Sequence, residues 1–359
     1  MTEKQPTIYD VAEAAGVSIA TVSRVMSGGS ASARAREKVE SAIARLNYRP
    51  SQPARSPDRE ETRTLALVVT DLKNPYYTAL CAGAEAEAAR RGYGLQVYCT
   101  AASDKGLLSR LLKHPLDGAI LVGGFIEDSE QASASPSPEA AREAIRQNVL
   151  RLQQAMPLVT IGPPIEGVSC VNITSDLGLS VRKSITHLTV LGHRRIAFIG
   201  GSTSTRSATL REIAFHEEMA KRGLPSFQDT RTETGFDPQA GELCVTKLFS
   251  RVSPAQRPTA LIAINDLVAL GAMHQLLRMG LRVPEDVALI GCDNQFFTPF
   301  LDPPLTTVDL HPYDHGVCAV SELAAICSGS NPLAFSQIRE CSLIVRESCG
   351  AHYGARVFD

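Results

Sequence analysis

From residue 64 onward, short apolar segments rich in β-branched residues alternate with longer stretches that have helical periodicity. The apolar segments are LALVV (65–69), YGLQVYC (93–99), AILVGG (119–124), PLVTIG (157–162), RRIAFIGG (194–201), TALIAIN (259–265) and DVALIGC (286–292). Strands separated by helices are joined by crossovers, so the alternation predicts parallel sheets covered by helices on both faces. In such sheets ligands bind beyond the carboxyl ends of the strands. The residues that follow each segment are therefore the first candidates for a binding site.

Polar and aromatic side chains do follow these segments. They are Asp71, Asn74, Tyr76 and Tyr77 after the first, the hydroxyl-rich stretch 202–209 after RRIAFIGG, Asn265 and Asp266 after LIAI, and Asp293 and Asn294 after the last. Carboxylates, amides and aromatic rings together can hydrogen-bond a polyol and stack on its apolar face. Each residue also has a structural alternative. Asn74 and Asn265 can cap the next helix, Asp293 can close a turn, and the two tyrosines can belong to the core.

The first fifty residues have a different pattern, which predicts three short helices. Thr7, Ser18 and Ser32 are candidate N-caps, and Gly16 is placed to end the first helix. The inward positions repeat at helical spacing. They are Ile8, Val11, Ala12 and Ala15, then Val22, Val25 and Met26, then Val39, Ala42, Ile43 and Leu46. Two helices joined by a tight glycine-containing turn and braced by a third form a helix-turn-helix, whose second helix fits the DNA major groove.

The outward face of the second helix supplies candidate DNA contacts, which are Ile19, Ala20, Thr21, Ser23 and Arg24. Arg24 can bind a guanine edge in a bidentate manner, whereas Ile19 and Ala20 offer apolar contact to a thymine methyl. Side chains suited to phosphate oxygens are Thr7, Tyr9, Ser18, Thr21, Ser23 and Asn47. Residues 1–60 contain nine Lys or Arg against seven Asp or Glu, although the whole chain has a net charge of −2. A helical bundle used only for packing or dimer contact is the alternative.

The segment TIYDVAEAAGVSIATVSRVMSG (7–28), followed by REKVESAIARLNYRP (36–50), resembles the DNA-binding head of the lactose/galactose repressor (LacI/GalR) family. Four later stretches are similar to blocks of the same family, so the resemblance covers nearly the whole chain. They are VVTDLKNPYYTALCAGAEAEAARRGY, HLTVLGHRRIAFIGG, TALIAINDLVALGAMHQLLRMGLRVPEDVALIGCDN and PPLTTVDLHPYDHG. The resemblance implies an all-α helix-turn-helix head and an α/β body of the periplasmic-binding-protein type. That body has two Rossmann-like subdomains with an effector in the cleft.

On this basis we expect four regions. Residues 1–50 form the helix-turn-helix head, 51–63 a linker, 64–349 the effector-binding and dimerisation domain, and 350–359 a tail. Within the body, subdomain N is expected at about 64–160 and 311–338, and subdomain C at about 161–310 and 339–349. In the long connection before PLVTIG, residues 138–156 read as a helix.

The linker departs from the family pattern, which has a short hinge helix with a leucine wedge. Ser51 replaces the usual asparagine and Pro57 replaces the wedge leucine. A proline inside a helix removes a donor and clashes with the preceding turn. We therefore expect a short or irregular hinge whose minor-groove contact rests on Arg55, with Pro57 as a candidate wedge. A plain flexible tether is the alternative.

The resemblance also implies roles for individual residues. Ile19 and Ala20 select the operator and Arg24 contacts a base. Arg211, Asn265, Asp266, Asp293 and Asn294 lie in the effector cleft, with Tyr76 and Tyr77 as its aromatic residues. This chain departs from the family pattern at Thr174 and Ser175, which stand for an Asp-Asn pair, at Leu310, which stands for a glutamine, and at Asn294, which stands for a second aspartate. The effector can therefore differ from the commonest one.

Enzymatic chemistry finds little support in the sequence. No nucleophile-elbow, P-loop or full dinucleotide motif is present, and Pro312 argues against His311 and His315 sharing one helical face as metal ligands. Nine scattered cysteines without a Cys-x-x-Cys spacing, and no apolar run at the N-terminus, favour a reducing cytoplasm. We expect no cofactor, no metal and no membrane contact.

The sequence therefore predicts a DNA-binding transcriptional regulator, most simply a repressor, controlled by a sugar or sugar derivative. Its partners would be double-stranded DNA with a near-palindromic operator and a second copy of the chain, with pairing into a tetramer left open. Two alternatives remain. One is a DNA-binding protein whose body only dimerises, and the other is an enzyme or a free carbohydrate-binding protein.

Overall fold

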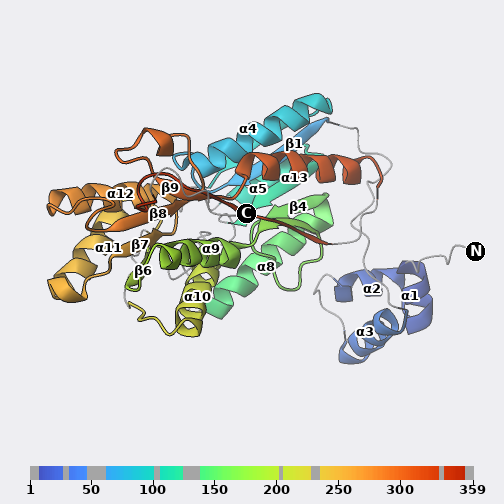
Figure 1. The fold of residues 1–359 in the computed structure, drawn as a ribbon. Coiled ribbons are helices and arrows are strands. Elements are labelled where there is room, and N and C mark those ends of the chain that lie inside the picture. Colours follow the sequence, from blue (N-terminus) through green and yellow to red (C-terminus); the bar gives the residue numbers. More distant parts are fainter. Residues whose placement is uncertain are drawn as a thin grey trace, which may run out of the picture.

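The computed structural model describes residues 8–26, 32–46, 62–100, 106–123, 138–201, 205–227, 235–330 and 335–351. Thr7, Asn47, Arg55 and Pro57 lie outside these ranges, so the DNA contacts expected from these residues, including those of the hinge, stay predictions. The expected architecture is confirmed: an N-terminal helical head is followed by two sheets of mainly parallel strands with helices around them (Figure 1).

The head contains the three expected helices, α1 (Ile8–Ala15), α2 (Ile19–Met26) and α3 (Ala33–Leu46). Gly16 follows α1 with a φ of +62°, a conformation that glycine adopts without a steric cost. Ser18 and Ser32 are N-caps, since each Oγ accepts a hydrogen bond at 3.2 Å from a backbone N–H three residues on. The small core contains Val11, Ala12, Ala15, Val22, Val25, Val39 and Ala42.

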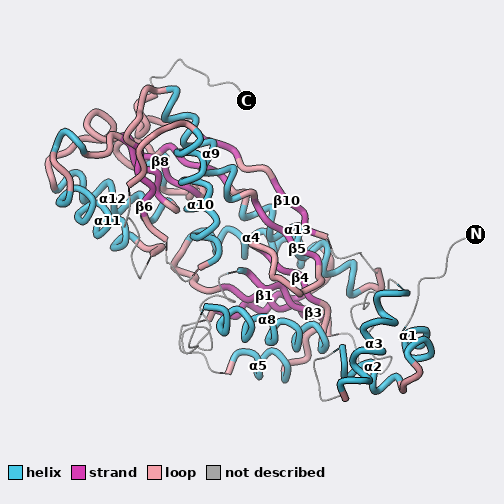
Figure 2. Tube along the Cα trace, turned by 90° about the horizontal axis from the view of Figure 1, so that it is seen from below, coloured by secondary structure: helices cyan, strands magenta, loops and turns pink. Residues whose placement is uncertain are grey.

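The first sheet of the body has six strands in the order β10-β5-β4-β3-β1-β2, with parallel pairing throughout. Their bounds are β1 (Thr64–Val69), β2 (Gly94–Cys99), β3 (Gly118–Val122), β4 (Leu158–Ile161), β5 (Val171–Ser175) and β10 (Ser336–Arg339). The helices beside this sheet are α4 (Pro75–Arg90), α5 (Leu107–Lys113), α8 (Pro138–Ala155) and α13 (Pro312–Cys327). Figure 2 shows α5 and α8 on one side of the sheet and α4 and α13 on the other.

The coverage of strand β1 on both faces explains why its sequence is apolar from Leu65 to Val69. Leu65, Leu67 and Val69 pack with residues of α4 and α13, whereas Ala66 and Val68 pack with residues of α5 and α8. Successive side chains of a strand point to opposite faces, so a strand covered on both sides needs apolar residues throughout. The helix expected at 138–156 is α8, one of the elements that cover this sheet.

The second sheet has five strands in the order β11-β9-β8-β7-β6, and only the β9–β11 pair is antiparallel. Their bounds are β6 (Ile196–Ile199), β7 (Ala260–Ala263), β8 (Ala288–Cys292), β9 (Thr306–Asp309) and β11 (Ser342–Ile344). The helices are α9 (Leu177–Val190), α10 (Arg206–Lys221), α11 (Pro238–Arg251) and α12 (Asp266–Arg278), with short 3₁₀ turns η1 (Pro254–Gln256) and η2 (Thr298–Phe300). Helix α9 packs against α10, and α11 against α12.

The expected subdomain boundary near residue 160 is wrong. Strand β5 pairs with β4 and β10 and therefore belongs to the first sheet, so the chain first crosses between the sheets after Ser175. The segment VNITS was missed because Asn172 and Thr174 interrupt its apolar run. Asn172 is nonetheless buried, since its amide donates hydrogen bonds of 3.0 Å to Thr160 Oγ1 and to the Gly162 carbonyl.

Three crossover segments join the two sheets, between β5 and α9, between β9 and α13, and between β10 and β11. Ser175 Oγ, at the end of β5, donates to the Leu310 carbonyl of the second crossover at 3.1 Å, and Lys183 Nζ of α9 donates to the Cys341 carbonyl of the third crossover at 2.9 Å. No described helix is long and apolar enough to cross a membrane.

Candidate functional site

The second helix of the head presents a polar and partly apolar outer surface. Ile19 has 40 % of its side chain exposed, whereas Val22 and Val25 of the same helix are buried. Ser18 Oγ and Thr21 Oγ1 lie 2.9 Å apart beside the first turn of α2. In a helix-turn-helix, an apolar residue and hydroxyl groups at the N-terminal end of the second helix can contact base edges and phosphates.

The predicted DNA contacts are described to different extents. Ser18, Ile19 and Thr21 are exposed or half-buried at the start of α2. Ala20, Ser23 and Arg24 belong to α2, and Tyr9 to α1, but their side chains lie outside the described part of the chain. Thr7, Asn47 and Arg55 lie outside it altogether. The helix that carries the predicted contacts is thus confirmed, and the individual contacts stay predictions.

A cavity of about 100 Å³ lies where the carboxyl ends of strands from both sheets meet. This is several times the space that holds one water molecule, roughly 10–15 Å³. Its lining residues are Asn74, Tyr76, Tyr77, Val122, Gly123, Ile161, Gly162, Pro163, Thr174, Ser175, Leu177, Ser207, Arg211, Phe236, Asp293, Leu310 and His315. Aromatic and aliphatic walls with a few convergent polar groups are typical of small-molecule sites.

Five of the seven predicted effector residues line this cavity: Asn74, Tyr76, Tyr77, Arg211 and Asp293. Asp71 and Asn265 do not. Asp71 is exposed, and its Oδ1 accepts a hydrogen bond from the Lys73 N–H at 2.8 Å, which closes a turn. Asn265 caps α12, because its Oδ1 accepts from the Val268 N–H at 2.8 Å while its amide donates to the Phe236 carbonyl at 2.9 Å. Asn265 therefore has the capping role that the sequence left open, and Asp71 has a role in a turn.

Arg211 is the buried cation of the cavity. It projects from α10 with 7 % of its surface exposed, and its guanidinium donates to the Ile264 carbonyl at 3.0 Å. Its Nε is buried without a hydrogen-bond partner among the described residues. A buried charged group of this kind retains hydrogen-bonding capacity for a ligand.

Asp293 is the buried carboxyl of the cavity. Burial raises the pKa of its side chain from 3.8 to about 7, and the nearby Arg211 guanidinium opposes that rise. Its φ is +111°, an unfavourable conformation for a residue with a side chain, and its N–H donates to the Val308 carbonyl at 2.7 Å. Strained backbone that is held by its neighbours is common at binding sites.

The two tyrosines come from the first turn of α4. Their ring centroids lie 5.3 Å apart and the rings are almost perpendicular, at 87°. Burial raises the pKa of the Tyr76 hydroxyl, and the Asp293 carboxyl adds to the rise, so Tyr76 stays a neutral donor and acceptor. Asn74 caps the same helix through a hydrogen bond of 3.0 Å from the Tyr76 N–H to its Oδ1. The start of α4 therefore positions three residues of the cavity lining, Asn74, Tyr76 and Tyr77.

Among the other lining residues, Ser207 belongs to the hydroxyl-rich stretch 202–209, whereas Phe236 and His315 were not expected from the sequence as site residues. His315 was weighed only as a metal ligand with His311. His311 precedes α13 in a left-handed conformation with φ of 55°, whereas His315 lies inside the helix and is 1 % exposed. His315 comes a few residues after the segment that leads from β9 to α13. This position in the sequence could have indicated that its side chain lies in the cleft.

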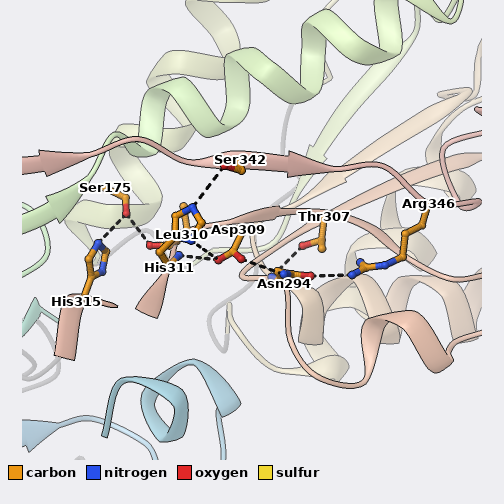
Figure 3. A network of polar contacts seen from close by, with 9 residues as sticks. All are labelled: Ser175, Asn294, Thr307, Asp309, Leu310, His311, His315, Ser342 and Arg346. Carbon is orange, nitrogen blue, oxygen red and sulfur yellow. Dashed lines mark hydrogen bonds and ion pairs between the residues drawn. The ribbon is translucent and has the colours of Figure 1, made fainter. Parts of the chain in front are cut away.

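A network of polar contacts fixes the loop that follows β8 and carries Asp293 (Figure 3). Asp309 accepts from the Asn294 amide at 3.0 Å and from the His311 N–H at 2.7 Å, and Arg346 donates to Asn294 Oδ1 at 2.9 Å. Asp266 is fully buried and accepts from the Gln295 N–H at 2.7 Å and from Thr307 Oγ1 at 2.6 Å. Asp266 and Asn294 therefore position the loop and do not line the cavity.

A wider groove of about 570 Å³ lies next to this cavity and shares Asp293 with it. Its lining includes Asp309, His311, Tyr313 and Asp314 from the β9 crossover and α13. Arg211, the aromatic pair and the hydroxyl groups of Ser175 and Ser207 line only the smaller cavity. The side chains that can bind a polyol are therefore gathered in the smaller cavity.

Comparison with known proteins agrees with both parts of this structure. Residues 7–51 match the family "Bacterial regulatory proteins, lacI family", and residues 185–349 match the "Periplasmic binding protein-like domain". The HTH-type transcriptional regulator DegA of Bacillus subtilis (strain 168) is 34 % identical over 306 residues, which is 84 % of this chain and 86 % of DegA.

Two solved structures resemble the whole chain. The lac repressor dimer bound to operator and the anti-inducer ONPF has a TM-score of 0.68 at 26 % identity, covering 97 % of this chain and 100 % of that one. A complex of the transcriptional regulator CelR with cellobiose has a TM-score of 0.67 at 27 % identity, covering 96 % and 99 %. These relatives are transcriptional regulators and not enzymes. The chain belongs to the LacI family of bacterial regulatory proteins and is a DNA-binding transcriptional repressor with an effector-binding carboxyl-terminal region.

Proposed function

We propose that the smaller cavity binds a small, neutral, carbohydrate-like effector, whose presence changes the affinity of the repressor for its operator. The observation that carries this proposal is the convergence of Arg211, Asp293 and two tyrosine rings at the junction of the two sheets. Among the described lining residues Arg211 carries a positive charge and Asp293 has a pKa of about 7, so the lining carries no large excess charge. Hydroxyl groups and aromatic faces supply the remaining contacts that a polyol needs.

The proposed effector contacts are Asn74, Tyr76, Tyr77, Arg211 and Asp293. The proposed DNA contacts are Thr7, Tyr9, Ser18, Ile19, Ala20, Thr21, Ser23, Arg24, Asn47 and Arg55. The complex of CelR with cellobiose supports a sugar as the class of effector. The departures at Thr174, Ser175 and Leu310 support an effector that differs from those of other family members.

The functional unit that we propose is a homodimer that works in the cytoplasm. The related lac repressor structure contains a dimer on its operator, which supports this assembly. Two heads related by a two-fold axis would occupy successive major grooves, roughly 34–36 Å apart, on a near-palindromic site. The effector would act by changing the angle between the two sheets, because two of the three segments that connect the sheets, those between β5 and α9 and between β9 and α13, also border the cavity.

A thermal-shift screen of the full chain tests the effector proposal. The probes are D-ribose, D-glucose, D-galactose and cellobiose. We expect at least one of them to raise the melting temperature, because a ligand that binds only the folded state stabilises it. The variant Arg211→Ala should lose that shift and keep its affinity for operator DNA. Lys221→Ala, an exposed basic residue of the same helix, is the matched control. A full shift in Arg211→Ala would contradict the assignment of the cavity.

A further inference from the structure

His315 is a buried polar side chain of the cavity that the proposed contacts leave unused. It is the fourth residue of α13, is 1 % exposed, and lines the cavity together with Ser175 and Leu310. Its Nε2 lies 3.2 Å from Ser175 Oγ (Figure 3). Its Nδ1 is buried and has no hydrogen-bond partner among the described residues. A buried nitrogen without a partner is costly, so it is expected to have a function.

The surroundings of His315 select one form of its ring. Ser175 Oγ donates its proton to the Leu310 carbonyl at 3.1 Å, so this oxygen is an acceptor toward His315. The ring must then carry its proton on Nε2, which leaves a lone pair on Nδ1. Burial lowers the pKa of His315 to about 4, and Arg339 and His311 add to this effect. The ring is consequently neutral at physiological pH.

We propose that His315 is a specificity-determining residue of the effector site, with Nδ1 as a fixed acceptor for a hydroxyl or N–H group of the effector. The inference rests on the proposed function and deepens it, because it requires a donor on the part of the effector that faces α13. An effector that presents an apolar group or a carbonyl oxygen there would leave Nδ1 unpaired and would be rejected.

Two departures from the family pattern make the same region distinctive. Ser175 stands at one of two positions that carry an Asp-Asn pair, and Leu310 stands where a glutamine is usual. In this chain Leu310 contributes its carbonyl to the Ser175 hydroxyl, and its side chain is buried. The polar group on this wall is therefore supplied by His315 from the helix, and Ser175 orients it.

The first test needs no effector. Long-range ¹H–¹⁵N NMR spectra of the full chain with ¹⁵N-labelled histidine, assigned by comparison with His315→Asn, report which ring nitrogen carries the proton. We expect the Nε2–H form in the free protein. In Ser175→Ala the neutral ring should be a mixture of the Nε2–H and Nδ1–H forms, because no acceptor then holds Nε2–H. A proton on Nδ1 in the wild-type chain would overturn the proposal, whatever sugars bind.

The second test uses the sugar among D-ribose, D-glucose, D-galactose and cellobiose that shifts the wild-type melting temperature. In His315→Asn the amide oxygen can occupy the place of Nδ1, and we expect a dissociation constant within about threefold of wild type. In His315→Leu the acceptor is lost, and we expect roughly tenfold weaker binding or more. His274→Leu, which changes an exposed histidine of α12, should bind as wild type does.

Monodeoxy analogues of that sugar identify the hydroxyl group that donates a hydrogen bond to Nδ1. One analogue should bind more weakly than the parent sugar to the wild type but equally to His315→Leu, since the two changes remove the same hydrogen bond. Wild-type affinity in His315→Leu would overturn the assignment of His315 while leaving the cavity proposal intact. Failure of all four sugars to bind the wild type would instead count against the proposed class of effector, and the NMR result would still decide the state of His315.

Discussion

At the scale of single residues, Asp293 combines burial, a positive φ and a neighbouring arginine. It is 7 % exposed, it has a positive φ, and it lies beside the only buried arginine of the described cavity lining. Burial disfavours the charged carboxylate, and Arg211 compensates only in part. The native state therefore holds a proton on Asp293 over a pH range in which the unfolded chain has lost it.

This environment predicts a pH-dependent stability. The pKa of Asp293 is about 7 in the folded chain against an ordinary value of 3.8, so its contribution is fully present below about pH 4 and is lost as the pH rises through 7. One pKa unit corresponds to about 1.4 kcal/mol, so the free energy of unfolding should fall by roughly 4 kcal/mol over this range because of this group. In Asp293→Asn that part of the slope should disappear.

Urea unfolding of the full chain at a series of pH values, followed by circular dichroism because the chain has no tryptophan, measures this slope. Asp314→Asn, which changes an exposed carboxylate on α13, is the control and should retain the wild-type slope. If Asp293→Asn and the wild type lose stability in parallel between about pH 4 and 7, Asp293 is not protonated in the native state.

At the scale of elements, the contact between α4 and α13 positions one side of the cavity. A Cβ atom at Gly83 would collide with the carbonyl oxygen of Tyr313, and one at Gly316 with the carbonyl oxygen of Leu80. Only glycine permits such a close approach of two helix backbones. The first turn of α4 carries Tyr76 and Tyr77, and α13 carries His315, so the spacing of the two helices determines the distance between these lining residues.

We therefore expect Gly83→Ala to destabilise the body by about 1–3 kcal/mol, as overpacking of a tight contact does. It should also weaken sugar binding, because Tyr313 and the start of α13 must shift to admit the new methyl group. Ala82→Ser adds one atom at the neighbouring exposed position of the same helix and should change neither property. Thermal melting and the sugar titration measure both effects. A Gly83→Ala variant as stable as the wild type would show that the two helices can separate without cost.

At the scale of the whole molecule, the proposed coupling between the cavity and the head has to pass through the body, since the two lie in different parts of the chain and share no element. Coupling between two binding sites is reciprocal. If the effector changes operator affinity by a given factor, operator DNA must change effector affinity by the same factor. Typical coupling factors are roughly 5–150.

Fluorescence anisotropy measures the factor by which the sugar changes operator affinity. Sugar titrations with and without operator DNA measure the factor by which the DNA changes sugar affinity. The two factors should be equal. Arg211→Ala should lose the response to sugar and keep operator affinity, whereas Arg24→Ala should keep sugar binding and lose sequence preference. Unequal factors would exclude a simple two-site coupling. Equal weakening of all DNA sequences by Arg24→Ala would make that residue a backbone contact.

The amino-acid pattern alone determined the kinds of elements and most of their positions. The capping serines and Gly16 of the head act within one or two turns of the chain, and the apolar run of β1 reflects coverage on both faces. Local hydrogen bonds and burial periodicity are properties of short segments, so they can be recognised in the sequence. Five of the seven effector residues predicted from the sequence line the cavity, because the ends of parallel strands converge there.

Other features depend on long-range contacts, and these were decided only by the tertiary structure. Asn265 has the same flanking sequence whether it caps a helix or binds a ligand, and only the Phe236 carbonyl and the Val268 N–H show which it does. The sheet to which β5 belongs depends on pairing with β4 and with the distant β10, whose Ser336 lies opposite Asn172. His315 became a site residue because Ser175, 140 residues earlier in the chain, lies beside it and sets its proton. Such roles arise from partners that the chain brings together only when it folds.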